Sequence, residues 1–327
     1  MTAETKTAAT IVLVLAFAVL LSVASGQAAD MKIENGQTVI DQAGRSISVP
    51  KPFERIISLY GAHTENLFAL GAGHFVIGVS PIEDFPPEAR QKPVFSYHDD
   101  PEKFMAARPD LVLVRPMIDR GYPQFVQRLE KSGIAVVSLQ PGTVEEMLTY
   151  WEILGLLVGR RDQAVAMAAR FRQAVSQIRS LTDAVTPRKR VYFEAIHDKM
   201  KTFSPDSMAV FALEAAGGIN VARDALPVRD TNIAAYGKER ILARASEIDV
   251  FLAQSGTMNP ASIEMIRAES GFQAIRAVKN NQIFLIDERL VSRPTLRLLD
   301  GIFEIGKILY PNDFTERARE IINRAKP

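Results

Sequence analysis

The sequence predicts an α/β fold of two lobes joined by one long helix. Segment 160–183 is typical of an amphipathic helix, because its apolar residues recur at steps of three and four and so form one stripe. The residues of this stripe are Ala164, Ala168, Phe171, Val175 and Ile178. Strands alternate with helices on both sides of this segment, in a similar order. We therefore expect two Rossmann-like α/β lobes joined by a single long rigid helix.

Length, charge and composition narrow the classes of function. The chain has 327 residues, enough for two small domains, and a formal net charge of +1. A charge this close to zero favours neither nucleic acid nor a bulk anionic surface as a partner. The sequence has no Cys, which excludes disulfides, thiolate metal sites, a cysteine nucleophile and a lipidated Cys.

The beginning of the chain has the layout of a secretory signal. An apolar run at 8–23 follows a short polar start that contains Lys6, and small residues fill 24–29. We take residues 1–29 as a signal peptide that is cleaved between Gly26 and Asp30. A retained membrane anchor is the alternative, although the run is short for a membrane span. The expected location is the periplasm, and we expect no lipid anchor.

Residues 30–159 are expected to form the N-terminal lobe. A hairpin opens it, with strands at 38–40 and 46–49 around a turn at Gly44. Strands then alternate with helices, the strands at 56–59, 76–79, 111–114 and 135–139 and the helices at 63–70, 102–107 and 122–131. Nearly unbroken apolar strands predict a mostly parallel sheet covered on both faces. A helix through Trp151 leads into the connecting helix, to which we assign residues 160–186.

Residues 187–327 are expected to form the C-terminal lobe, in which the pattern starts again. Its strands are expected at 191–195, 219–221, 248–252 and 283–286, and its helices at 206–216, 238–243, 261–267 and 295–309. Short motifs repeat between the halves in the same order. A helix beginning near Glu102 precedes the strand at 111–114, as a helix near Glu239 precedes the strand at 248–252. This repeat predicts two related lobes.

Several segments carry a family resemblance. Residues 55–73, RIISLYGAHTENLFALGAG, resemble the opening of the solute-binding proteins that serve ABC importers of iron-siderophores, haem and cobalamin, and the similarity continues at 84–89, 108–113 and 292–294. In that family one rigid helix joins two α/β lobes and the ligand lies in the cleft between them. The resemblance therefore implies the same architecture as the repeat. This chain departs from the family at 60–63, where small residues and proline are more frequent, so the resemblance does not imply a particular ligand.

The candidate ligand-binding residues follow the carboxyl ends of predicted strands, where ligands gather in parallel sheets, or lie in the 95–100 segment that the family places at the cleft. They are Tyr60, His63, Tyr97, His98, Arg115, His197, Tyr236 and Arg293. The tyrosines could form flat pocket walls, and the arginines favour an anionic ligand unless Arg115 pairs with a neighbouring carboxylate such as Asp119. Imidazole is a common metal ligand, so His63, His98 and His197 are candidates for a metal site. An anionic metal chelate would satisfy both groups of residues.

Three functions compete. The first is a non-catalytic, monomeric periplasmic receptor that hands a metal-bearing compound, namely a ferric siderophore, corrinoid or haem, to an ABC permease. The second is direct capture of a transition-metal ion by the three histidines, with Glu194 as a possible fourth ligand. The third is an exported metal-dependent hydrolase. Since HExxH and the common nucleophile motifs are missing from the sequence, we expect no enzyme and no catalytic cofactor.

Two acidic residues are candidates for docking to the permease. Glu102 and Glu239 hold matching positions at the starts of matching helices, one in each half. The family resemblance implies that acidic residues at these places face arginines of the permease. The alternative is that both only interact with the dipole of their own helix.

Overall fold

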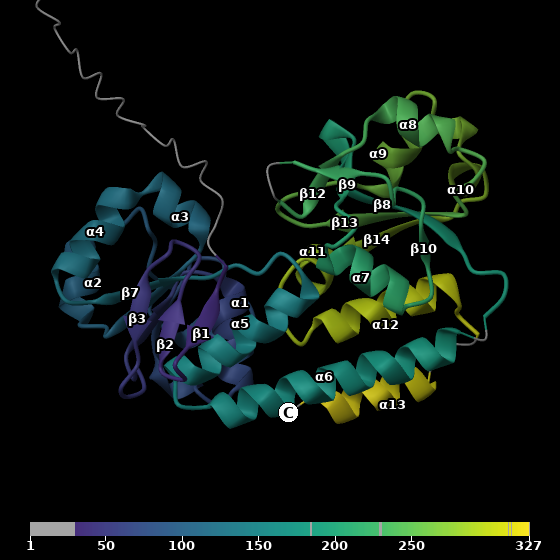
Figure 1. The fold of residues 1–327 in the computed structure, drawn as a ribbon. Helices are drawn as coiled ribbons and strands as arrows, with labels where there is room; N and C mark the ends of the chain where they lie inside the picture. The colour runs from purple at the N-terminus through teal and green to yellow at the C-terminus, as the bar shows by residue number, and fades with distance from the viewer. Residues whose placement is uncertain (1–29, 184, 229–230, 313, 315, 327) are drawn as a thin grey trace, which may run out of the picture.

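The computed structural model describes residues 30–183, 185–228, 231–312, 314 and 316–326. The expected signal peptide, residues 1–29, lies outside the described residues. Within the described part of the chain, no helix is both long enough and apolar enough to cross a membrane. Figure 1 shows two α/β lobes side by side, with helix α6 (Arg161–Thr182) running beneath both of them.

The first lobe contains two sheets. A small antiparallel sheet has the order β1 (Lys32–Glu34), β2 (Thr38–Ile40), β3 (Ser46–Ser48). A parallel sheet has the order β5 (Val76–Val79), β4 (Ile56–Ser58), β6 (Leu111–Val114), β7 (Ala135–Ser138). Every residue of β4 and β6 is buried, as expected for central strands covered on both faces. The covering helices are α1 (Gly61–Ala69), α2 (Pro101–Ala107), α3 (Pro116–Gly121) and α4 (Pro123–Lys131).

The second lobe has a seven-stranded mixed sheet. Its order is β11 (Leu226–Pro227), β12 (Ile233–Ala235), β9 (Lys201–Phe203), β8 (Arg190–Ile196), β13 (Val250–Ser255), β14 (Ile283–Asp287), with β10 (Ile219–Asn220) also paired to β8. The strand pairs β8–β9, β9–β12 and β12–β11 are antiparallel. The four predicted strands, β8, β10, β13 and β14, pair in parallel as expected. The antiparallel strands β9, β11 and β12 were not predicted, because strands of two or three residues are too short to show a period.

Helices cover this second sheet and extend the lobe toward α6. They are α7 (Met208–Ala215), α8 (Lys238–Ala243), α9 (Ile263–Ala268), α10 (Arg276–Lys279), α11 (Glu288–Val291), α12 (Leu298–Leu309) and α13 (Glu316–Ala325). Helix α13 was not predicted. It carries its own apolar stripe, which includes Ala318, Ile321 and Ile322, and packs against α6.

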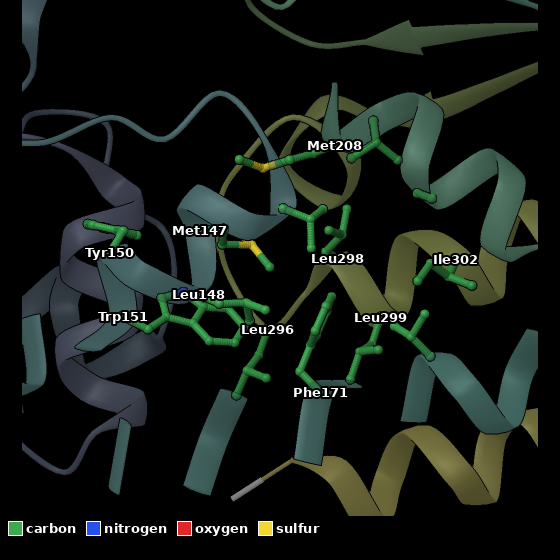
Figure 2. Packing of buried hydrophobic residues seen from close by; sticks show 14 of the residues in the cluster. Met147, Leu148, Tyr150, Trp151, Phe171, Met208, Leu296, Leu298, Leu299 and Ile302 are labelled. Atoms are coloured by element: carbon green, nitrogen blue, oxygen red, sulfur yellow. The ribbon is translucent and has the colours of Figure 1, made fainter. Parts of the chain in front are cut away.

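One hydrophobic core links the two lobes through α5 (Val144–Leu157) and α6. All five residues of the predicted apolar stripe on α6 are buried. Trp151 of α5 meets the ring of Phe171 of α6 edge-on, with 5.5 Å between ring centroids. Figure 2 shows Leu299 and Ile302 of α12 in the same cluster, on the side of the second lobe. The lobes are thus joined by a packed helical layer and not by a flexible linker.

Candidate functional site

Two of the predicted residues meet at the carboxyl edge of the first parallel sheet. Tyr60 follows β4 and Arg115 follows β6, and these two strands are neighbours. Neighbouring parallel strands end at the same edge, so the two loops lie together. The guanidinium carbon of Arg115 is 4.6 Å from the centroid of the Tyr60 ring, a cation–π contact that orients both side chains.

Arg115 has no carboxylate partner in the described part of the chain. Its Nη2 donates to the weak acceptor Sδ of Met117 at 3.1 Å, and its Nε is buried with no hydrogen-bond partner. Asp119, the alternative partner considered from the sequence, instead accepts two hydrogen bonds from Arg45, at 2.6 and 3.1 Å. A half-buried guanidinium of this kind can bind an anionic group of a ligand.

Arg293 differs, because it is already paired across the lobes. Its Nη1 donates to Oε1 of Glu65 in α1 at 2.9 Å, and Arg297 donates to both oxygens of the same carboxylate at 2.8 and 2.5 Å. The Glu65 side chain is 2% exposed. The structure thus places the predicted anion-binding Arg293 in an ion pair with its own chain, and sequence reasoning missed Glu65 and Arg297.

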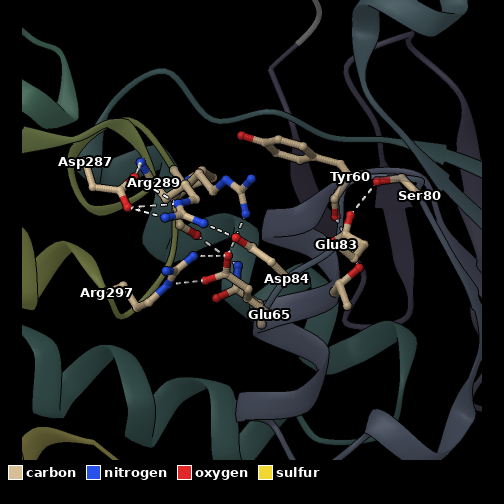
Figure 3. A network of polar contacts seen from close by, with 12 residues as sticks. Tyr60, Glu65, Ser80, Glu83, Asp84, Asp287, Arg289 and Arg297 are labelled. Atoms are coloured by element: carbon tan, nitrogen blue, oxygen red, sulfur yellow. Dashed lines mark hydrogen bonds and ion pairs between the residues drawn. The ribbon is translucent and has the colours of Figure 1, made fainter. Parts of the chain in front are cut away.

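Further polar contacts tie the lobes together, as Figure 3 shows for the ionic part of the network. Arg289 pairs with Asp84 of the first lobe and with Asp287 of its own lobe. The carbonyl oxygen of Pro294 accepts hydrogen bonds from Asn66 Nδ2 at 2.9 Å and from Trp151 Nε1 at 3.1 Å. Segment 289–297 is therefore held by the first lobe at several points.

Glu83 stands at the edge of this network with one oxygen unpaired. Its Oε1 accepts from Ser80 Oγ at 2.5 Å, while its Oε2 is buried and has no hydrogen-bond partner among the described residues. Burial raises the pKa of Glu83 to about 7, although the Ser80 hydrogen bond and the charge of Arg293 act in the opposite direction. Glu83 therefore changes its charge near neutral pH.

We expect Glu83→Gln to stabilise the protein at pH 8 but not at pH 4. A carboxyl whose folded-state pKa is raised to about 7 contributes stability that is lost as the pH rises from about 4.5 through 7, because the folded state disfavours the charged form. Glutamine cannot ionise, so the variant does not lose this stability as the pH rises. The melting temperature should rise by about 2–6 °C at pH 8. Melting curves between pH 4 and pH 8 measure this, with the exposed Glu88→Gln as control. Parallel curves for the two variants would contradict the assignment.

The structure does not bring the three predicted metal-binding histidines together. His63 is fully buried, its Nδ1 lies 2.7 Å from Tyr150 Oη and its Nε2 lies 3.0 Å from the carbonyl oxygen of Val114. Because a carbonyl only accepts, Nε2 carries the proton and Nδ1 accepts from the tyrosine. Burial lowers the pKa of His63 to about 3, so the ring is neutral. This corrects the prediction for His63, which is a core residue with both ring nitrogens engaged.

The other two histidines lie in different surroundings. His197 is buried in the second lobe, where its Nδ1 is 3.0 Å from Oε2 of Glu194, and this contact raises the pKa of His197. His98 is exposed in the first lobe and packs against Tyr97 and Tyr122. Across the described residues, no group of three or more His, Cys, Asp and Glu side chains could hold a metal ion. The predicted three-histidine metal site is therefore not formed.

The two remaining tyrosines have different roles. Tyr97 belongs to an aromatic cluster with His98 and Tyr122, with centroid distances of 4.3 and 4.8 Å, and it lies at the surface of the first lobe. Tyr236 is buried in the core of the second lobe and donates to Asp224 Oδ1 at 3.3 Å. Tyr236 is thus placed as a packing residue, which corrects its prediction as a pocket wall.

Two cavities are lined by both lobes. The larger, about 870 Å³, includes Gln140 and Glu146 from the first lobe and Ser204 and Asn232 from the second. The smaller, about 490 Å³, is lined by residues such as Ile82, Asp84, Thr257, Arg289 and Arg293. Both volumes fall within the range of small-molecule sites. Tyr60 and Arg115 line neither of these two cavities.

Comparisons of the sequence and of the fold with known proteins find the same kind of protein. The sequence model described as periplasmic binding protein matches residues 56–290. An uncharacterized ABC transporter substrate-binding lipoprotein of Bacillus subtilis is 24% identical over 85% of this chain and 87% of its own length. The vitamin B12-binding protein of Vibrio cholerae is 25% identical over 79% of this chain and 90% of its own length. The solved structure of a possible iron-binding, periplasmic solute-binding protein of Staphylococcus epidermidis has a TM-score of 0.69 at 27% identity, covering 80% of this chain and 100% of that chain.

Proposed function

The chain belongs to the periplasmic binding protein family and is the solute-binding component of an ABC importer, and we propose that its solute is a metal chelate that carries an anionic group, with a cobalamin-type corrinoid as the first candidate. Membership of the family implies an exported protein that delivers a small molecule to a membrane permease. Haem and a ferric siderophore are the alternative chelates. We further propose that the protein is a monomer and has no catalytic activity.

The observation that carries the proposal is the charge of Arg115. It lies at the edge of the sheet where ligands of α/β proteins gather, and it has no carboxylate partner among the described residues. The similarity to the vitamin B12-binding protein of Vibrio cholerae favours a corrinoid, which carries a phosphodiester. Direct capture of a bare metal ion has no support in the described residues, since the histidines that it needs are apart and an arginine repels a cation.

The test is to purify the protein as exported and record its absorption spectrum and metal content. We expect a corrin spectrum with one cobalt per chain, or corrin binding when cyanocobalamin is added. A Soret band with iron would identify haem, and a ferric charge-transfer band would identify a siderophore. Bare zinc, or no binding of any of these chelates, would contradict the proposal.

We propose a periplasmic location after cleavage of residues 1–29. The apolar run and the small residues after it support the cleavage, and the absence of Cys from the sequence leaves no residue for the usual lipid attachment. The intact mass of the same preparation measures the start of the mature chain.

We also propose that Glu102 and Glu239 form the docking pair for the permease. Glu102 is in the first turn of α2, 55% exposed, and pairs with Arg128 of the same lobe. Glu239 is exposed in the first turn of α8. Each residue thus presents a carboxylate on the surface of its own lobe. An exposed pair such as Glu102–Arg128 contributes little to stability, so its arginine can be exchanged for one of the permease.

Reversing both charges should impair docking and leave ligand binding intact. Charged pairs across a docking surface chiefly set orientation and encounter rate. We expect Glu102→Lys with Glu239→Lys to lose most of the stimulation of permease ATPase activity in proteoliposomes, at unchanged ligand affinity. The matched control reverses one exposed glutamate on each lobe elsewhere, as Glu88→Lys with Glu264→Lys. Equal stimulation by both double variants would show that the docking pair lies elsewhere.

A further inference from the structure

A third cavity, of about 380 Å³, lies on the second lobe, away from the two cavities between the lobes. The end of α6, the helix α7 and the short strand β10 surround it, and α7 contacts both α6 and β10. Three of its lining residues are Arg179, Arg188 and Arg223. We call it the arginine cavity.

Two of these arginines are held by contacts that involve no carboxylate. Arg188 donates from Nε to the carbonyl oxygen of Gly217 at 2.9 Å, which leaves its two Nη groups free of that bond. The guanidinium carbon of Arg179 lies 5.1 Å from the centroid of the Phe211 ring. Neither these two nor Arg223 forms an ion pair with another described residue. Arg179 and Arg188 are therefore held by contacts other than ion pairs.

Asn220 also lines the cavity, and its side-chain amide has an unpaired donor. Asn220 is 4% exposed. Its Oδ1 accepts a hydrogen bond from the backbone N–H of Ala222 at 2.9 Å, which fixes the orientation of the side-chain amide. Its Nδ2 is buried and has no hydrogen-bond partner among the described residues. A buried donor without a partner is costly, and an acceptor group of a ligand would satisfy it.

Two carboxylates also line the cavity and set the charge balance. They are Asp183 and Glu214, so that with both ionised the three arginines leave one positive charge. Burial raises the pKa of Glu214, the nearby Asp206 raises it further, and Arg179 and Arg188 lower it. Protonation of Glu214 would therefore increase the positive charge available to an anion.

We propose that the arginine cavity binds a small anion that carries carboxylate or phosphate groups, with charge supplied by the three arginines and a hydrogen bond donated by Asn220 Nδ2. Arginine forks match the geometry of both kinds of group. The volume of about 380 Å³ suits a small organic anion better than a macromolecule. The site is separate from the solute site between the lobes and does not depend on the identity of the imported chelate.

The experiment is calorimetric titration of the mature protein with citrate, inorganic phosphate and glucose 6-phosphate, each at constant ionic strength set with chloride. We expect saturable binding at one site per chain for at least one probe, and the tighter probe identifies the carboxylate or the phosphate as the preferred group. Arg188→Gln and Arg179→Gln should each weaken the affinity for that probe by about tenfold or more. Glu214→Gln should strengthen it, because a competing carboxylate is removed.

The matched control is Arg319→Gln. Arg319 also lies over an aromatic ring, that of Phe303, at 5.0 Å, but it does not line the cavity. The variant Arg319→Gln should bind the anion with the affinity of the wild type. Melting temperatures within about 2 °C of wild type show that Arg188→Gln and Arg179→Gln are folded. The proposal is overturned if no probe binds saturably, or if the cavity variants bind as tightly as Arg319→Gln.

Discussion

Glu65→Ala is expected to destabilise the protein by about 3–5 kcal/mol, because it leaves two nearly buried arginines without their carboxylate. Arg293 and Arg297 are 16% and 15% exposed, and both bond to Glu65 across the lobes. Removing one partner of a buried ion pair forces the remaining charges to stay desolvated without compensation. For a chain of this size the loss corresponds to a decrease in melting temperature of about 10 °C.

Calorimetry or circular dichroism measures this loss, with Glu88→Ala as an exposed control. Replacing the whole triad by apolar residues, as Glu65→Leu with Arg293→Met and Arg297→Met, should restore most of the lost stability, since no charge then remains to be desolvated. That recovery separates the ionic explanation from a packing defect in α1. A melting temperature for Glu65→Ala close to that of the control would show that the inter-lobe ion pairs contribute little.

The fold could be predicted where a period extends over many residues. The stripe of α6 covers several turns, and its five apolar residues are all buried. The short strands β9, β11 and β12 have two or three residues each, so their antiparallel pairing left no pattern to detect. Helix α13 has a detectable stripe near the end of the chain, which sequence reasoning overlooked.

The site was harder to predict, because residue type does not reveal partners. Arg115 and Arg293 look equivalent in the sequence, as arginines in segments that follow strands. The structure distinguishes them through Glu65, which pairs with Arg293 from 228 residues away. In the same way, His63 looks like a ligand at the start of a helix, and only the tertiary contacts with Tyr150 and Val114 show that its ring is part of the core.

The difference between the two arginines leads to the second large effect, on ligand binding. We expect Arg115→Ala to weaken binding of the imported chelate by at least about thirtyfold, because a desolvated ligand anion would lose its charged partner. Stability should change little, since Arg115 has no carboxylate partner in the described part of the chain. Arg115→Lys should recover only part of the affinity, because lysine keeps the charge but lacks the planar fork.

Equilibrium titration with the chelate identified in the purified protein measures the effect, and Arg120→Ala serves as control. Arg120 is an exposed arginine of helix α3, which begins directly after Arg115, so its removal changes the net charge equally without touching Tyr60. Added salt should weaken binding by the wild type and the control more than binding by Arg115→Ala, since the variant has lost the charge that salt screens. Wild-type affinity of Arg115→Ala, together with lost affinity of Arg293→Ala, would mean that the ligand anion displaces Glu65 and binds at the inter-lobe ion pair instead.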